Sequence, residues 1–148
     1  KILYQFSARG HELGQILLGM QLDQPNDAAS AYYRSRPLML TLGLDAEDAI
    51  ASGMAKSGGY SDGRDIGVVC NKPGNDGVTV LPMAGDVGSQ YTPAAGWAQA
   101  VEYRKKVLKD DEYSNAISVI LGGDGSVATN GFSISDKVPI CLYTLAVS

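Results

Sequence analysis

Residue types that commonly build metal and redox sites are scarce in this chain of 148 residues, which has one histidine and two cysteines. A site that needs a pair of histidines is therefore excluded. We interpret His11 as a polar residue near the start of a helix, because a single residue is a weak signal. Cys70 and Cys141 lack the spacing of metal ligands, so we expect reduced, structural thiols in a cytoplasmic setting.

Positive charge and long apolar runs are scarce as well. Twelve basic residues against sixteen acidic ones give a formal net charge of −4, and no basic patch is interleaved with aromatic residues. This balance argues against nucleic acid as a partner. No apolar run is long enough to span a membrane, and residues 1–10, KILYQFSARG, lack the apolar centre of a signal peptide. We therefore expect a soluble globular domain with no membrane partner.

Three helices are expected from periodicity and capping signals. Asp45 and Asp48 resemble a capping box at the start of a helix that we expect to pack on a sheet. Thr92 and Pro93 suit the cap and the first position of a longer helix. Apolar residues at helical spacing predict the remaining one. The predicted helices cover residues 11–22, 46–56 and 93–109.

Two apolar runs predict strands of a parallel sheet. The run that begins at Ala116 and the run Val138–Val147 lack clean alternation, which is typical of strands buried on both faces. Between the predicted helices, residues 58–88 are rich in Gly, Asp, Asn and Pro, and we expect them to form a long loop that binds a ligand. The alternation of helices and strands indicates an α/β domain.

The most informative stretch is residues 116–131, AISVILGGDGSVATNG, in which the first predicted strand leads directly into a glycine-rich acidic turn. Asp124 then stands at the carboxyl end of a strand, where parallel sheets bind ligands. Flanking glycines allow the backbone to approach a phosphate, and a carboxylate suits Mg²⁺ that bridges to phosphate oxygens. The alternative is a plain turn, since Gly-Asp-Gly often forms one for local reasons. The stretch matches neither a complete G-x-G-x-x-G fingerprint nor a Walker loop.

Separated segments, taken together, resemble a known family. They are ARGHELGQ followed by AYYRSR and LTLGL, then GDVGSQYTPAAGWAQAV, then GGDGSVATNGF. Their order and spacing are similar to those of the α subunit of thiamine-diphosphate-dependent 2-oxoacid dehydrogenases, over nearly the whole chain. The branched-chain 2-oxoisovalerate type is most similar, through Tyr32, Tyr33, Arg34 and the insert that ends in Gly63 and Arg64. The resemblance implies the thiamine-diphosphate-binding α/β fold, a parallel sheet with helices on both faces, as a partial domain over 1–148 that is incomplete at both ends.

The resemblance also implies which residues hold the organic part and the diphosphate of the cofactor. Tyr33 and Arg34 match the Tyr-Arg pair that grips the diphosphate, and a guanidinium suits bidentate hydrogen bonds to phosphate oxygens. The alternative is a surface arginine beside a core tyrosine. Gly85 and Val87 match the positions whose backbone meets the aminopyrimidine ring, and the alternative there is a plain loop glycine.

For the metal, the resemblance implies one side-chain ligand in this chain. Asp124 matches the Mg²⁺ ligand, and Gly125 and Ser126 match positions that offer main-chain groups to the metal and the phosphate. The family places a second ligand, an Asn, just after the next strand, but Thr144–Ser148 contains none. The resemblance gives no catalytic residue in this chain.

The resemblance implies a reaction that needs partners. It is the thiamine-diphosphate-dependent oxidative decarboxylation of a branched-chain 2-oxo acid, with acyl transfer to the lipoyl domain of the E2 acyltransferase. The cofactor of the family lies between α and β subunits, and the Glu that activates it comes from E1 β, so we expect this chain alone to be inactive. Such a protein belongs in the bacterial cytoplasm or, in a eukaryote, in the mitochondrial matrix.

Departures from the family pattern keep other readings open. Only Ser133–Lys137 separate Phe132 from the second predicted strand, where the family has a whole helix, and a crossover between parallel strands needs about a dozen residues. The family also has a His near the position of Val69 and another in place of Arg36. A truncated or repurposed fragment without activity is therefore one alternative, and a pyruvate or acetoin dehydrogenase relative is another.

Overall fold

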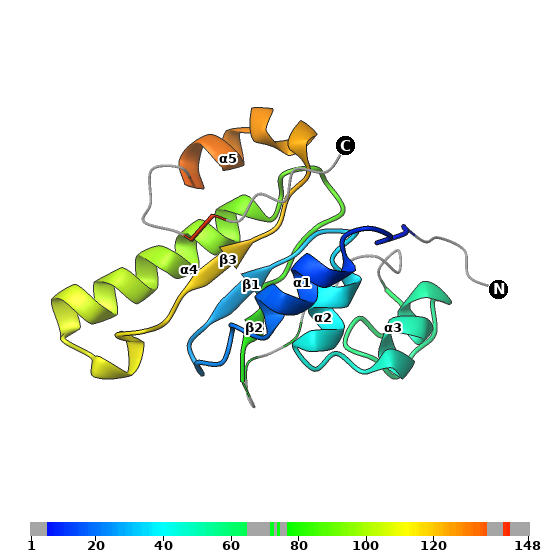
Figure 1. Cartoon of the computed structure of the whole chain (residues 1–148), viewed down its shortest axis with the longest axis horizontal. Coiled ribbons are helices and arrows are strands. Elements are labelled where there is room, and N and C mark those ends of the chain that lie inside the picture. Colours follow the sequence, from blue (N-terminus) through cyan, green and yellow to red (C-terminus); the bar gives the residue numbers. More distant parts are fainter. Residues whose placement is uncertain (1–5, 65–71, 73, 75–76, 136–140, 143–148) are drawn as a thin grey trace.

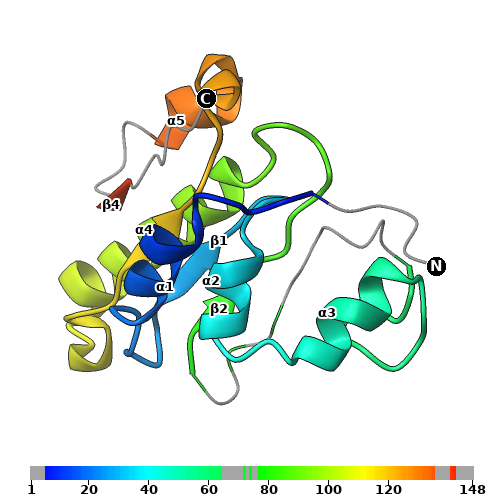
Figure 2. The ribbon, with the colours of Figure 1, turned by 45° about the vertical axis from the view of Figure 1, so that its right-hand side comes forward.

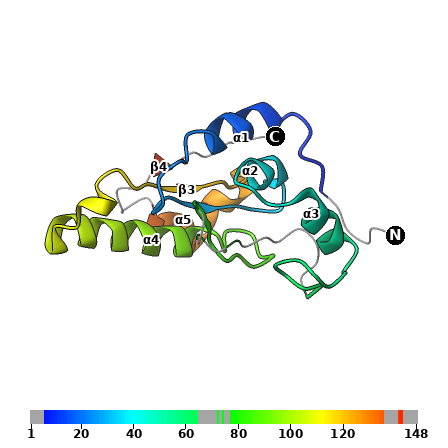
Figure 3. The ribbon, with the colours of Figure 1, turned by 90° about the horizontal axis from the view of Figure 1, so that it is seen from below.

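The computed structural model describes residues 6–64, 72, 74, 77–135 and 141–142. Within these residues a parallel sheet forms in the strand order β2-β1-β3-β4, with helices on both faces (Figure 1, Figure 3). The expected α/β architecture is confirmed. The strands are β1 (Ala28–Ser30), β2 (Thr79–Val80), β3 (Ser118–Ile120) and β4 (Cys141–Leu142).

Strand β1 lies between β2 and β3, although its sequence, Ala-Ala-Ser, has no strong preference for strand. Its start is fixed by Asp27, whose buried carboxylate accepts hydrogen bonds from the backbone N–H groups of Gln24 (3.0 Å) and Ile117 (2.8 Å). Ile117 directly precedes β3, so this carboxylate ties the starts of both strands together. Strand β2 corrects the prediction of an uninterrupted loop over 58–88, because Thr79 and Val80 pair with β1.

Two apolar layers cover the sheet, one on each face. Ala29 and Val119 point toward the layer that includes Leu38 and Met39, whereas Ala28 and Ile120 point toward Tyr91 and Ala94. Successive strand residues alternate between the faces, as the pleat requires. The buried run SVI of β3 confirms the prediction of a strand covered on both sides.

Helices α1 (Glu12–Gly19) and α2 (Arg36–Thr41) lie on one face of the sheet (Figure 3). The helix expected over 11–22 is confirmed, but its apolar stripe points outward: Leu13 is 71% exposed, whereas Gln15 and Gly19 are buried. The reason is a polar contact, because the Gln15 carboxamide donates to the backbone oxygen of Arg34 (3.1 Å) and accepts from the backbone N–H of Leu38 (3.2 Å). Helix α2 was not predicted.

Helix α3 (Ala46–Gly53) begins at the expected cap residue, Asp45, but does not lie over the sheet as expected. Asp45 accepts from the backbone N–H of Glu47 (2.7 Å), whereas the Asp48 carboxylate accepts from Tyr60 (3.0 Å), so the predicted capping box does not form. The helix lies beyond α2, to one side of the sheet, in each view (Figure 1, Figure 2, Figure 3). The prediction that it packs on the sheet is therefore wrong.

Helices α4 (Tyr91–Tyr103) and α5 (Asn130–Ser135) cover the other face (Figure 3). Ala94, Ala98 and Val101 are buried, as expected for α4. Its N-cap is Gln90 rather than Thr92. The helix continues through a π-helical turn, η1 (Arg104–Leu108), close to the predicted end at residue 109, and a 3₁₀ turn, η2 (Asp111–Tyr113), follows.

The connection from β3 to β4 contains a helix, contrary to the expectation drawn from the few residues after Phe132. A 3₁₀ turn, η3 (Asp124–Ala128), leads into α5, which begins before Phe132, so residues 121–140 give the crossover enough length. Of the second predicted strand, Cys141 and Leu142 are described, and they pair with β3. Val69, Cys70 and Thr144–Ser148 lie outside the described residues. None of the described helices is long and apolar enough to cross a membrane.

Candidate functional site

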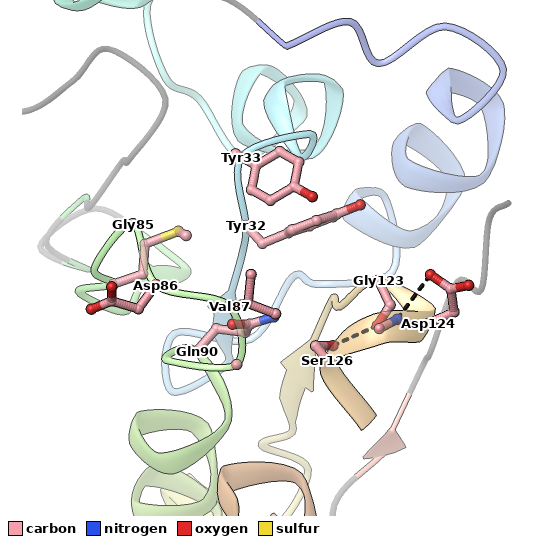
Figure 4. A pocket seen from close by; sticks show the side chains of 12 residues that line it. Tyr32, Tyr33, Gly85, Asp86, Val87, Gln90, Gly123, Asp124 and Ser126 are labelled. Atoms are coloured by element: carbon pink, nitrogen blue, oxygen red, sulfur yellow. Dashed lines mark hydrogen bonds between the residues drawn. The ribbon is translucent and has the colours of Figure 1, made fainter. Parts of the chain in front are cut away.

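A pocket of about 350 Å³ opens at the carboxyl ends of β1, β2 and β3 (Figure 4). From β1 the chain goes to β2 on one side and later to β3 on the other, so the pocket lies where the strand order reverses, the usual ligand position in such sheets. Its volume lies within the range of about 300–1,000 Å³ for small-molecule sites. It is lined by Tyr32, Tyr33, Met83, Gly85, Asp86, Val87, Gly88, Gln90, Gly123, Asp124, Gly125 and Ser126.

The segment after β1 contributes two tyrosines whose rings pack against each other at an angle of 56°. The ring centroids of Tyr32 and Tyr33 are 4.4 Å apart, and the Tyr32 ring points toward Gly123 and Asp124 (Figure 4). Burial raises the pKa of the Tyr32 phenol, and the Arg34 guanidinium opposes this through its charge and a hydrogen bond. Tyr32 was not among the predicted site residues. Its place beside the Tyr-Arg pair was the one signal for it.

Arg34 is the predicted site residue that does not line the pocket. Its guanidinium donates to the backbone oxygen of Ser7 (2.8 Å) and lies 5.4 Å from the centroid of the Tyr33 ring. The side chain is therefore held against the segment that precedes α1. The Nη1 group that bonds the Ser7 oxygen is therefore engaged outside the pocket.

The loop before α4 forms the second wall. Gly85 and Val87 line the pocket on this side. The side chain of Val87 is accessible from the pocket, since Val87 is 62% exposed. Gly88 has φ +87°, and a Cβ at this position would come within 2.4 Å of the Thr129 hydroxyl oxygen, so this close approach to the far end of η3 needs glycine. Asp86 lies across the pocket from Asp124 (Figure 4).

The acidic turn after β3 forms the third wall. The exposed Asp124 carboxylate accepts a hydrogen bond from the backbone N–H of Gly125 (2.8 Å), and the backbone N–H of Ser126 donates to the oxygen of Gly123 (3.0 Å). The Ser126 hydroxyl is buried and donates to the same oxygen (2.5 Å). The backbone N–H groups of Gly125 and Ser126 are thus engaged within the turn.

The comparison with known families agrees with this geometry. The sequence model of the dehydrogenase E1 component family matches residues 2–134. This chain belongs to the dehydrogenase E1 component family. Its membership supports the general class of thiamine-dependent 2-oxoacid decarboxylation, and six of the seven site residues predicted from the sequence line one pocket: Tyr33, Gly85, Val87, Asp124, Gly125 and Ser126. No curated protein matches the chain.

The donor set of this E1 component chain fits a magnesium ion that is shared with a phosphate ligand. Among the described residues, no three His, Cys, Asp or Glu side chains gather closely enough to hold a metal by themselves. Mg²⁺ does not require such a cage, because it keeps several waters and takes one or two carboxylates together with phosphate oxygens. Asp124 supplies one carboxylate at a glycine-rich turn, and the pocket volume suits a ligand of cofactor size.

Proposed function

We propose that this chain is the α part of an α/β E1 component that holds thiamine diphosphate and Mg²⁺ for the oxidative decarboxylation of a branched-chain 2-oxo acid. The acyl group would pass to the lipoyl domain of an E2 acyltransferase. The observation that carries the proposal is the convergence of Asp124, Tyr33 and the Gly85–Val87 segment on one pocket at the strand-order reversal. These segments are far apart in the sequence, and the fold brings them to one pocket. Their convergence therefore supports the proposal more strongly than any single motif does.

Each wall has a separate task in this proposal. Asp124 would hold Mg²⁺, and Gly125 and Ser126 would turn main-chain groups toward the metal and the phosphate. Tyr33 and Arg34 would bind the diphosphate, while Gly85 and Val87 would meet the aminopyrimidine ring. When bound, thiamine diphosphate supplies the electron sink, and the protein supplies binding and orientation.

The composition of the pocket supports a second protein subunit. Its described lining contains two carboxylates, Asp86 and Asp124, and no glutamate. We infer that the glutamate that activates the cofactor comes from an E1 β subunit, which would close the open side of the pocket. A bacterial cytoplasm or a mitochondrial matrix would be the location of such a complex.

An inactive relative is the alternative function, and two observations favour it. Arg34 is bonded to the Ser7 oxygen and does not reach the pocket, and the turn uses its own N–H groups. In that case the fold would persist with little affinity for a diphosphate.

Calorimetric titration with thiamine diphosphate and Mg²⁺ separates the two functions. We expect binding by the unchanged chain and loss of Mg²⁺-dependent binding in Asp124→Ala, because the matched side-chain ligand is removed. Asp111→Ala is the control, since this exposed aspartate lies in η2 and does not line the pocket. Equal affinity in Asp124→Ala and Asp111→Ala would refute the assignment, and absence of binding by the unchanged chain even in the presence of an E1 β subunit would favour the inactive relative.

A further inference from the structure

Two walls of the pocket are joined by two side chains from the start of α4, of which Gln90 lines the pocket and Tyr91 does not. Gln90, the N-cap residue, is 2% exposed, and Tyr91, the first helical residue, is 1% exposed. Each of these side chains reaches the segment that follows β3. Both are polar, and both have hydrogen-bond partners inside the core, as buried polar groups require.

Gln90 fixes the start of that segment. Its carboxamide donates to the backbone oxygen of Leu121 (3.1 Å), and its own backbone oxygen accepts from the Ser30 hydroxyl (2.8 Å). The last residue of β1, the cap of α4 and the residue after β3 are thereby linked by two buried hydrogen bonds.

Tyr91 fixes the acidic turn itself. Its hydroxyl oxygen lies 2.6 Å from the Ser126 hydroxyl oxygen, and both side chains are buried. Ser126 has one hydroxyl proton, which it donates to the Gly123 oxygen, so the Tyr91 hydroxyl is the donor to Ser126. A Cβ at Gly122 would come within 2.1 Å of the Tyr91 hydroxyl oxygen, so only glycine there leaves room for this contact.

The result is one directed chain of hydrogen bonds from α4 to the peptide before Asp124. Because the Gly123 oxygen is held by two hydrogen bonds from Ser126, the N–H of Asp124, in the same trans peptide, points the opposite way. The backbone that carries the exposed Asp124 carboxylate is therefore held by the Ser126 N–H and by a pair of hydroxyls, of which that of Tyr91 lies outside the pocket lining. The Tyr91 ring is packed edge-on against Phe132 of α5, with centroids 5.4 Å apart.

We propose that Tyr91 is a positioning residue that acts through Ser126 on the Gly123–Asp124 peptide. The identity of the ligand that binds more tightly because of Tyr91 rests on the proposed function, whereas the effect of Tyr91 on the turn does not depend on that function. Loss of a buried hydrogen bond between neutral groups should loosen the turn, and weaken binding of Mg²⁺ with thiamine diphosphate, about two- to tenfold.

Amide hydrogen exchange without any ligand is the first test, with Tyr91→Phe, Ser126→Ala and the double variant. We expect exchange over 121–129 to be about two- to tenfold faster in each single variant. The double variant should be no faster than Ser126→Ala, because the Tyr91 hydroxyl acts only through Ser126. Tyr91→Phe keeps the ring packing, and Tyr103→Phe, at the exposed end of α4, is the matched control.

Titration of the same variants with thiamine diphosphate and Mg²⁺ is the second test. We expect Tyr91→Phe to lose affinity, Ser126→Ala to lose at least as much because it removes both bonds, and the double variant to lose no more than Ser126→Ala, with no loss in Tyr103→Phe. Exchange at the wild-type rate over 121–129, a uniform increase over the whole chain, or losses that multiply in the double variant would each overturn the positioning role. Failure of the unchanged chain to bind the cofactor in the presence of an E1 β subunit would refute the proposed function, while the exchange result on the chain alone would still decide the role of Tyr91.

Discussion

The position of Arg34 leads to a prediction whose size can be estimated from its contacts. A hydrogen bond from a guanidinium to a phosphate oxygen is worth about 1.5–3 kcal/mol. Turning the Nη1 group of Arg34 toward the pocket would cost its bond to the Ser7 oxygen, and a typical hydrogen bond contributes about 1 kcal/mol net. The difference, about 0.5–2 kcal/mol, predicts that Arg34→Ala weakens thiamine diphosphate binding about two- to thirtyfold.

Isothermal titration at two ionic strengths measures this loss. Arg104→Ala is the control, because Arg104 pairs with Asp110 at the far end of α4. Arg34→Lys should retain part of the affinity, since a lysine keeps the charge but not the planar fork. Equal affinity in Arg34→Ala and Arg104→Ala would refute a role for Arg34 in binding the diphosphate. A loss well above a hundredfold would instead show that the guanidinium is already directed at the ligand.

Three further outcomes are expected. Asp27→Ala should lower the free energy of unfolding by about 2–5 kcal/mol in urea titrations, because it leaves two backbone N–H groups without their acceptor; a loss below about 1 kcal/mol would contradict this. The raised pKa of Tyr32 means that its contribution to stability is complete below the unfolded value of 10.0 and is lost as the pH rises through the folded pKa, so Tyr32→Phe should reduce the alkaline loss of stability seen in melting curves. The chain alone should release no CO₂ from 2-oxoisovalerate with cofactor, Mg²⁺ and an artificial electron acceptor, whereas an added E1 β subunit should restore release; turnover without a partner would argue against a shared site.

Sequence reasoning found the strongly patterned parts of the fold and missed the parts that depend on tertiary contacts. β3 was predictable because Val119 and Ile120 are β-branched and buried on both faces. β1 was not, because Ala28 and Ala29 form a strand only between two neighbouring strands. The orientation of α1 could not be predicted from the sequence either, since the hydrogen bonds of Gln15 decide which side of the helix faces the core.

The residues of the candidate site also divide into those that sequence patterns reveal and those whose role depends on tertiary contacts. The acidic turn was visible in the sequence because glycines and a carboxylate follow a buried strand. Tyr91 was not, because its hydroxyl gains a role only where α4 passes Ser126, thirty-five positions away. The direction of Arg34 likewise depends on Ser7, a contact that no local pattern encodes.

The two alanines of β1 face opposite sides of the sheet, so substitutions at these positions would displace different layers of helices. Ala28 faces α4 and Ala29 faces the layer of α2, and neither has any exposed surface. A larger residue at Ala28 would push outward the helix that begins with Gln90 and Tyr91, and so widen the pocket from that side. The same change at Ala29 would move the opposite layer and leave that wall in place. Substitutions at two neighbouring positions of one short strand can therefore change the width of the pocket and the position of α2 separately.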